Sequence, residues 1–308
     1  MIKLCIKCGA EGHANRTCRE PVTSYGIIIY RHAKEGELKG RLHPFVQSPC
    51  NRHTEPPNFH QRPCRENEIL FYLVERKDTI GFLNIVQGNY NETTLRYAVD
   101  QLTCEERLKL RVMPFETLWG IAGTRKKDMQ YCKNRFQQTD WAAYLDRTQC
   151  LYREGDFLMP KGRLQYHESV MRCAIREFSE ESGYPEDAVE LLRMKPYQET
   201  FTGPDAKLYR NVYFVGRLKD TARVTVNLGD DVAQSKEVRN MGFFNIVECQ
   251  ALIRNYHYMK KHILMSVYRS LAEQTCDQAE YSKWFIRTSS YNRIKGFLNS
   301  TTECWRAF

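Results

Sequence analysis

The sequence predicts a protein of the α+β class, and two patterns carry that prediction. Short runs rich in β-branched and aromatic residues, typical of buried strands, recur in both halves of the chain. Between them, from about residue 91 to 147, apolar residues recur at helical spacing instead. With 308 residues, 42% of them hydrophobic and 27% charged, the chain can bury a substantial core in one large or two modest domains.

The expected strands lie on both sides of this helical segment. They are residues 25–31, 69–75, 156–159, 198–201, 208–216 and 237–244. Long helical patterns then extend from 246 to 273. The last thirty residues are too aromatic for a disordered tail, and the sequence assigns them no element.

The most informative segment is GRLQYHESVMRCAIREFSEESGY, from Gly162 to Tyr184. Within it, Met171, Ala174, Ile175 and Phe178 form one apolar stripe at i, i+3, i+4 and i+7, which predicts a helix packed on a core. Seven further positions share a fixed spacing; they are Gly162, Glu168, Arg176, Glu177, Glu180, Glu181 and Gly183.

Three carboxylates beside that stripe indicate a cation site. Glu177, Glu180 and Glu181 are neighbours on the helix surface and repel one another unless a cation lies among them, and hard divalent ions prefer such oxygens. Arg176 lies one turn before Glu180 and can steady it. An acidic face that is merely solvated explains neither Gly162 nor Glu168 in register.

This segment resembles the signature of the Nudix hydrolases. The resemblance implies an α/β/α sandwich with a mixed sheet, in which residues 162–184 bind Mg²⁺ or Mn²⁺ and hydrolyse a pyrophosphate linkage. It further implies that Glu177, Glu180 and Glu181 are the metal ligands, Glu168 an auxiliary carboxylate and Arg176 an orienting partner. Bound metal would neutralise the pyrophosphate and activate a water molecule.

The balance of 46 Lys and Arg against 37 Asp and Glu leaves a charge of +9, which favours polyanionic partners such as RNA or inositol phosphates. No apolar run is long enough to cross a membrane, and the first residues lack the features of a signal peptide. We therefore expect a soluble, cytoplasmic protein. Twelve dispersed cysteines in a reducing compartment favour free thiols and metal sites over disulfides.

The first eighteen residues contain a second motif, C-x2-C-x4-H-x4-C, formed by Cys5, Cys8, His13 and Cys18. Three thiolates and one imidazole close a tetrahedral Zn²⁺ site, which predicts a structural zinc knuckle without an open catalytic position. Knuckles of this spacing resemble binders of single-stranded nucleic acid. The knuckle offers basic residues for such contacts but no aromatic ones.

A third cluster of possible ligands lies in a Pro-rich stretch. Cys50, His53, His60 and Cys64 have the spacing C-x2-H-x6-H-x3-C, which could close around a second Zn²⁺. The same stretch can equally be an exposed insertion that contains four such residues by chance. Both interpretations stay open.

The flanking segments, roughly from 25 to 271, resemble Nudix enzymes of the poxvirus, asfarvirus and giant-virus group, which remove the cap from mRNA. The expected organisation is a knuckle at 1–20, a Nudix domain at 21–90 and 148–308, and a helical insertion at 91–147. By the same resemblance, Glu237 holds metal or acts as general base, although it can also be an ordinary strand-end glutamate. In a viral enzyme the compartment would be the host cytoplasm.

Further cations are candidates for phosphate and RNA binding. Lys161 and Arg163 flank Gly162, and a basic segment of the insertion carries Arg125, Lys126, Lys127 and Lys133. The favoured function is hydrolysis of capped mRNA to m7GDP and 5′-monophosphate RNA. The alternatives are a hydrolase of diphosphoinositol polyphosphates or nucleotides, and a catalytically dead RNA-binding Nudix module, which the intact carboxylates disfavour.

Overall fold

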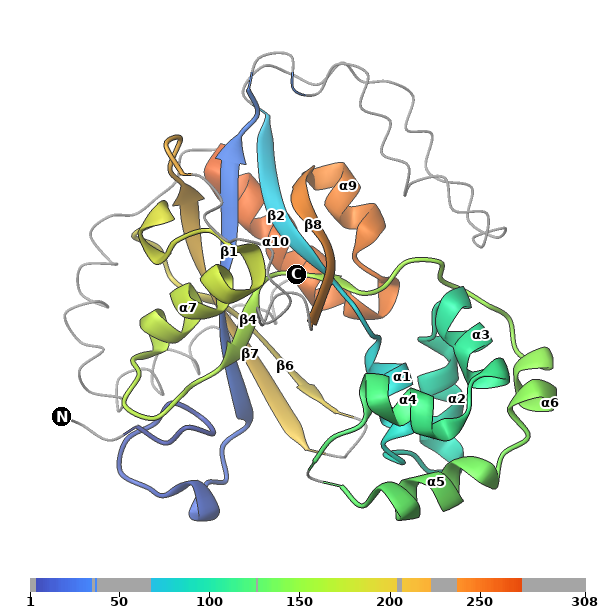
Figure 1. Ribbon diagram of the computed structural model, residues 1–308. Helices are drawn as coiled ribbons and strands as arrows, with labels where there is room; N and C mark the ends of the chain where they lie inside the picture. Colours follow the sequence, from blue (N-terminus) through green and yellow to red (C-terminus); the bar gives the residue numbers. More distant parts are fainter. Residues whose placement is uncertain are drawn as a thin grey trace, which may run out of the picture.

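A mixed β-sheet with helices on both faces forms the larger part of the molecule (Figure 1). The computed structural model describes residues 4–34, 37, 68–125, 127–203, 207–222 and 237–272. Within these ranges the sheet has eight strands: β1 (Val22–His32), β2 (Ile69–Arg76), β3 (Phe157–Leu158), β4 (Lys161–Arg163), β5 (Val189–Leu191), β6 (Tyr197–Thr202), β7 (Leu208–Leu218) and β8 (Val238–Asn245).

Strands β1 and β7 are parallel neighbours in the middle of the sheet, with Val22 opposite Tyr209. Every other pairing is antiparallel: β2 and β4 with β1, β3 and β8 with β2, and β5 and β6 with β7. The mixed sheet that the sequence resemblance implied is therefore confirmed. It brings β4, which opens the 162–184 segment, directly against the long strand β1.

Alternation along the strands divides the core into two layers, because successive side chains of a strand point to opposite faces. On β1, Ile27 and Ile29 face helix α7 (Val170–Ser182), where they meet Phe178. Ile28 faces the other side, where α9 (Ile246–Leu252) and α10 (Tyr258–Ala272) contribute side chains such as Leu264. The result is an α/β/α sandwich.

A helical lobe lies between β2 and β3 in the sequence and beside the sandwich in space (Figure 1). Its helices are α1 (Ile80–Val86), α2 (Glu92–Asp100), α3 (Cys104–Val112), α4 (Phe115–Ala122), α5 (Met129–Gln137) and α6 (Trp141–Asp146). They enclose a hydrophobic cluster of their own that includes Phe82, Val99, Leu118 and Trp141. Helix α1, which precedes the expected start of the insertion at 91, shares this core.

Arg254 joins the lobe to the sandwich. Its guanidinium donates to the backbone oxygens of Gln101 in the lobe and Glu154 on the returning chain, each at 2.6 Å. It also lies 3.4 Å from Asp156 Oδ1, and both side chains are almost completely buried. Burial alone would raise the pKa of Asp156, but hydrogen bonding to His257 and the charge of Arg254 lower it to about 2. Asp156 is therefore a carboxylate at neutral pH.

The structure departs from the sequence expectations at several points. A disulfide joins Cys104 to Cys150 across the lobe, so the expectation that the cysteines are free thiols or metal ligands is wrong for this pair. The short strands β4 and β5 were not expected. The expected strands and the helices after residue 246 are confirmed, whereas residues 50–64 and the last thirty lie outside the described residues. No described helix combines the length and apolarity needed to cross a lipid bilayer.

Candidate active site and metal-binding residues

Helix α7 presents the glutamates of the 162–184 segment at the face of the sheet. Its first turn is capped by Ser169, whose hydroxyl accepts a hydrogen bond from the backbone N–H of Arg172 at 3.2 Å. It ends at Gly183, which adopts the left-handed conformation (φ 74°) that favours glycine. The side chains of Ala174 and Phe178 are completely buried against the sheet. These contacts fix the direction in which the acidic edge of the helix points.

Arg176 is the cation that connects three of the carboxylates. Its guanidinium lies 2.8 Å from Glu168 Oε1, 2.7 Å from Glu177 Oε1 and 2.8 Å from Glu180 Oε2. It also donates to the backbone oxygen of Arg163 at 3.1 Å. Although burial tends to raise the pKa of Glu168, the hydrogen bonds from Arg176 lower it. The arginine thus ties the loop that follows β4 to the helix.

Gly162 leaves room for the Glu177 carboxylate. A Cβ atom built on Gly162 would lie 1.9 Å from Cδ and about as close to both oxygens of Glu177. No heavy atom can occupy that position while Glu177 keeps its place. Steric exclusion by the Glu177 carboxylate therefore explains why position 162 is a glycine.

We expect Gly162→Ala to lower turnover by roughly 10- to 100-fold, since a displacement near 1 Å in a catalytic site can cost that much. Gly120→Ala is the matched control, because Gly120 lies in α4 and a Cβ there meets nothing within 4 Å. Steady-state rates and thermal unfolding of both variants would be measured. Equal rates for Gly162→Ala and the control would contradict this account of the glycine.

Glu181 interacts with the charge of Lys161, and no ion pair with Arg176 is found for it among the described residues. Its Oε2 atom is buried and has no hydrogen-bond partner in the described part of the chain. Burial raises the pKa of Glu181 to about 8, with Lys161 opposing the shift and the charges of Glu177 and Glu237 adding to it. A buried carboxylate oxygen without a partner, close to two further carboxylates, fits a divalent metal site.

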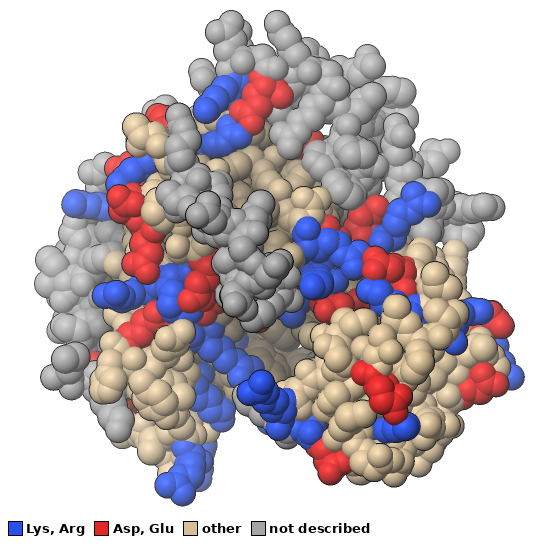
Figure 2. Space-filling view, viewed as in Figure 1, with Lys and Arg blue, Asp and Glu red and all other residues tan. Residues whose placement is uncertain are grey.

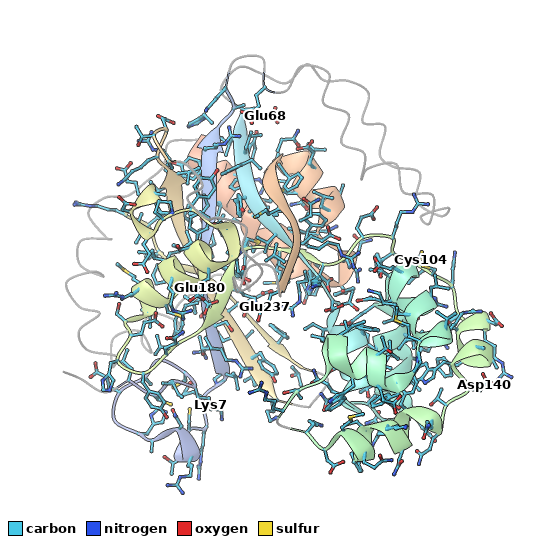
Figure 3. All side chains as sticks on the ribbon, in the orientation of Figure 1. Lys7, Glu68, Cys104, Asp140, Glu180 and Glu237 are labelled. Atoms are coloured by element: carbon cyan, nitrogen blue, oxygen red, sulfur yellow. A yellow bond between two sulfur atoms is a disulfide. The ribbon has the colours of Figure 1, made fainter. Side chains whose placement is uncertain are left out.

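Glu237 is exposed and acts on this group through its charge. It directly precedes β8, and its backbone oxygen accepts from Lys77 N at 2.8 Å. Figure 3 labels Glu180 on α7 and Glu237 directly before β8. The negative charge of Glu237 acts on both Glu177 and Glu181. Ion pairs therefore join residues 168, 176, 177 and 180, and the charges of 177, 181 and 237 interact, although in the described residues these carboxylates do not converge to within 4.8 Å of one another.

Two cations and one acid that the sequence analysis missed surround Lys161. Burial, together with the charges of Lys260 and Arg76, lowers the pKa of Lys161 to about 8, while Glu181 and Glu199 oppose the shift. Lys260 forms a buried ion pair with Glu199 at 2.8 Å. These residues come from β2, β6 and α10, so no local sequence pattern connects them with the 162–184 segment.

The N-terminal cysteines and histidine form a second candidate metal site. One ligand atom from each of Cys5, Cys8, His13 and Cys18 lies within 4.8 Å of all the others. The distance from Cys8 Sγ to His13 Nε2 is 3.4 Å. Usual zinc bond lengths in a tetrahedron give an edge of about 3.6 Å between sulfur and nitrogen, so the geometry fits Zn²⁺. Among the described residues, only this group of Cys, His, Asp or Glu side chains converges so closely.

The candidate RNA-binding cations occupy varied environments. Arg163, Arg125 and Lys127 are exposed, whereas Lys133 forms an ion pair with Glu116. Lys126 lies outside the described residues, as do Cys50, His53, His60 and Cys64 of the possible second zinc site. Figure 2 shows Lys and Arg side chains along the edges of a hollow between the helical lobe and the N-terminal side of the sandwich.

The model of one protein family, the NUDIX domain, matches residues 143–263. This part of the chain carries a NUDIX domain. The matched part contains β3 to β8 and α7, and therefore the whole carboxylate cluster. Strands β1 and β2 complete the sheet of this Nudix domain from before the helical lobe.

Viral proteins are also similar to this chain. The "Putative mRNA-decapping protein" of Acanthamoeba polyphaga mimivirus is 24% identical, with 86% of this chain and 93% of that protein covered. The "mRNA-decapping protein g5R" of African swine fever virus is 25% identical, with 50% and 68% covered. The resemblance to Nudix enzymes of large DNA viruses that the sequence predicted is thus confirmed.

Solved structures are also similar. An Ap4A hydrolase of C. elegans is 12% identical and covers 82% of this chain and 98% of its own, with a TM-score of 0.39. The Nudix hydrolase RenU of M. smegmatis is 7% identical and covers 87% and 96%, with a TM-score of 0.36.

Proposed function

We propose that this enzyme hydrolyses the pyrophosphate linkage of the 5′ cap of mRNA and releases m7GDP and 5′-monophosphate RNA. The similarity to the mimivirus protein carries the proposal, because it extends over 86% of this chain, well beyond the Nudix domain. The intact set of carboxylates around Arg176 supports an active enzyme. The exposed cations of the lobe support a polymeric anionic substrate.

Glu177, Glu180 and Glu181 would hold Mg²⁺ or Mn²⁺. When bound, the metal supplies charge neutralisation at the pyrophosphate and lowers the pKa of a coordinated water. Arg176 keeps Glu177 and Glu180 in place through its two short contacts. Lys161 lies beside Glu181 and would bind a phosphate oxygen, and Glu237 would accept the proton of the attacking water.

The remaining assignments are part of the same proposal. Cys5, Cys8, His13 and Cys18 would hold a structural Zn²⁺, and capped single-stranded RNA would lie in the hollow between the lobe and the N-terminal side (Figure 2). The chain would divide into a knuckle (1–20), a Nudix domain (21–90 and 148–308) and a helical insertion (91–147). The enzyme would act in the cytoplasm, that of the host if it is viral.

RNA labelled in the cap phosphates tests the proposal directly. We expect Mg²⁺- or Mn²⁺-dependent release of labelled m7GDP, separated from m7GMP and phosphate by thin-layer chromatography. Diphosphoinositol pentakisphosphate and diadenosine tetraphosphate serve as small competitors. Turnover of a small pyrophosphate without any m7GDP release from capped RNA would overturn the assignment of the cap as substrate. The assignment as a pyrophosphohydrolase would still stand.

Reversing charge on the lobe should weaken RNA binding selectively. We expect Arg125→Glu with Lys127→Glu to raise KM for capped RNA. The slope of log KM against log salt concentration should also become smaller, because each phosphate contact contributes about one unit to it. KM for a cap dinucleotide should stay unchanged. Arg217→Glu with Lys219→Glu, both exposed at the end of β7 on the β5–β7 side, is the control with the same change in net charge. Equal effects of both variants would mean that only net charge matters.

A further inference from the structure

The N-terminal Cys/His motif packs against the Nudix domain instead of standing apart from it. Tyr25 Oη donates a hydrogen bond to the backbone oxygen of Cys8 at 2.9 Å. The backbone N–H of Thr23 donates to Lys7 O at 2.8 Å. Leu4 packs on the hydrophobic layer between the sheet and α7. These contacts attach the turn that carries two of the four metal-binding residues to the first half of β1.

Gly9, directly after Cys8, closes the contact with α7. A Cβ on Gly9 would lie 2.1 Å from Tyr25 Oη and 3.3 Å from Cγ1 of Val170, the first residue of the helix. The glycine also has φ +73°, which other residues rarely adopt. The knuckle therefore meets α7 at its first turn, with no space left between them.

The same tyrosine connects the knuckle with the other end of the Nudix loop, residues 161–170. Tyr25 is opposite Gly162 in the β1–β4 pairing, and Gly162 accommodates the Glu177 carboxylate. The side chain of Tyr25 is buried in the layer that also contains Cys173 and Ala174 of α7. At one end of the loop, Gly162 pairs with Tyr25, which binds the backbone oxygen of Cys8. At the other end, Val170 lies against Gly9.

The loop itself contains a residue that needs such support. His167 has φ +63°, in the left-handed region that non-glycine residues rarely occupy. Strained conformations of this kind persist only when the surrounding structure holds them. Arg176 holds the loop from the helix side, through Glu168 and the Arg163 carbonyl. The knuckle is placed to hold it from the opposite side.

We propose that Zn²⁺ in the knuckle positions the Nudix loop, so that losing the metal impairs hydrolysis of every pyrophosphate substrate, short or long. The contacts of Cys8 and Gly9 with Tyr25 and Val170 carry this inference. It rests on the proposed zinc site and pyrophosphohydrolase activity. It differs from a knuckle that only binds RNA, whose removal would leave small substrates untouched.

The test compares four full-length variants with the wild type. Cys5→Ser removes a metal ligand; His13→Cys keeps four ligands and should retain zinc. Tyr25→Phe removes only the hydroxyl that bonds to Cys8, and Arg16→Ala with Arg19→Ala removes exposed knuckle cations without touching the ligands. Zinc content, hydrogen exchange of residues 161–175, and turnover of a cap dinucleotide and of capped RNA would be measured.

We expect Cys5→Ser to lose zinc, to exchange faster over 161–175 and to lose on the order of tenfold in kcat on both substrates. Tyr25→Phe should keep zinc and show a smaller change in the same direction, and His13→Cys should behave as wild type. The Arg16 and Arg19 variant should affect capped RNA alone. If hydrogen exchange in α10 also becomes faster in Cys5→Ser, that variant has unfolded globally. The comparison of Tyr25→Phe with the wild type then tests the proposal.

Three results would overturn the proposal. One is a wild-type protein without zinc. Another is a zinc-free variant with unchanged exchange over 161–175 and unchanged turnover of the dinucleotide. The third applies if Cys5→Ser has unfolded globally: it is a Tyr25→Phe variant whose hydrogen exchange and turnover equal those of the wild type. Absence of wild-type turnover on any pyrophosphate would instead contradict the proposed function, and the exchange data would still test the knuckle.

Discussion

Replacing Glu181 by glutamine is expected to lower turnover on the order of 10²- to 10³-fold at saturating Mg²⁺ or Mn²⁺, the range typical for losing one group that stabilises transition-state charge. Burial raises the pKa of Glu181 to about 8 in spite of the charge of Lys161, and its buried Oε2 has no hydrogen-bond partner in the described residues, so its negative charge destabilises the metal-free fold. Glutamine has the same shape without that charge. The metal-free variant should therefore unfold at the wild-type temperature or above it.

Turnover and thermal unfolding, each with and without metal, check this expectation together. Metal should raise the unfolding temperature of the wild type and not that of Glu181→Gln, because a ligand stabilises only a state that binds it. Glu186→Gln, at an exposed position after α7, is the matched control. Undiminished turnover of the double variant Glu180→Gln, Glu181→Gln would contradict the role given to the whole carboxylate cluster.

Arg254→Met is expected to be the most destabilising of the substitutions considered, by about 3–5 kcal/mol, as found when one partner of a buried ion pair is removed. Asp156 would keep its buried carboxylate but lose the guanidinium 3.4 Å away. The backbone oxygens of Gln101 and Glu154 would lose their donor as well. Arg239→Met is the control, because the half-exposed Arg239–Glu105 pair should be worth about 0–1 kcal/mol.

The effect of Arg254→Met should depend on pH. In the folded protein the pKa of Asp156 is about 2, below its ordinary value of 3.8, so the carboxylate contributes stability above about pH 4 and loses it as the pH falls towards 2. The difference in free energy of unfolding between wild type and variant should therefore shrink below pH 3. Urea unfolding at pH 7 and pH 2 measures it. A difference that is equal at both pH values would exclude the ion pair as its source.

The strands and α7 could be predicted because their signals are local. Alternating or β-branched runs mark β1, β2 and β7, and the stripe from Met171 to Phe178 marks the helix that carries the acids. Glu237 was predicted only through family resemblance, since it lies far from the 162–184 segment in the sequence. Its proximity to Glu177 and Glu181 depends on how β8 pairs with β2.

The residues that sequence analysis missed have no local signal at all. Arg76, Glu199 and Lys260 come from three separate elements and meet only in the folded protein. A lone arginine such as Arg254 looks like any surface cation until its burial is known. The Cys104–Cys150 bridge was missed because the expected reducing compartment argued against it. Strands β4 and β5, of three residues each, are too short to show a periodicity.

The parallel pairing of β1 with β7 also constrains the order of events during folding. Val22 pairs with Tyr209, so the two halves of the central ladder are separated by most of the polypeptide. Closing a loop of that size before any contact forms is entropically unfavourable, and long-range parallel pairing is slow. On the ribosome, the edge of β1 that pairs with β7 must wait without its partner while the helical lobe, whose contacts are local, can already assemble. Nascent chains are therefore most vulnerable to aggregation through β1 until about residue 218 has emerged.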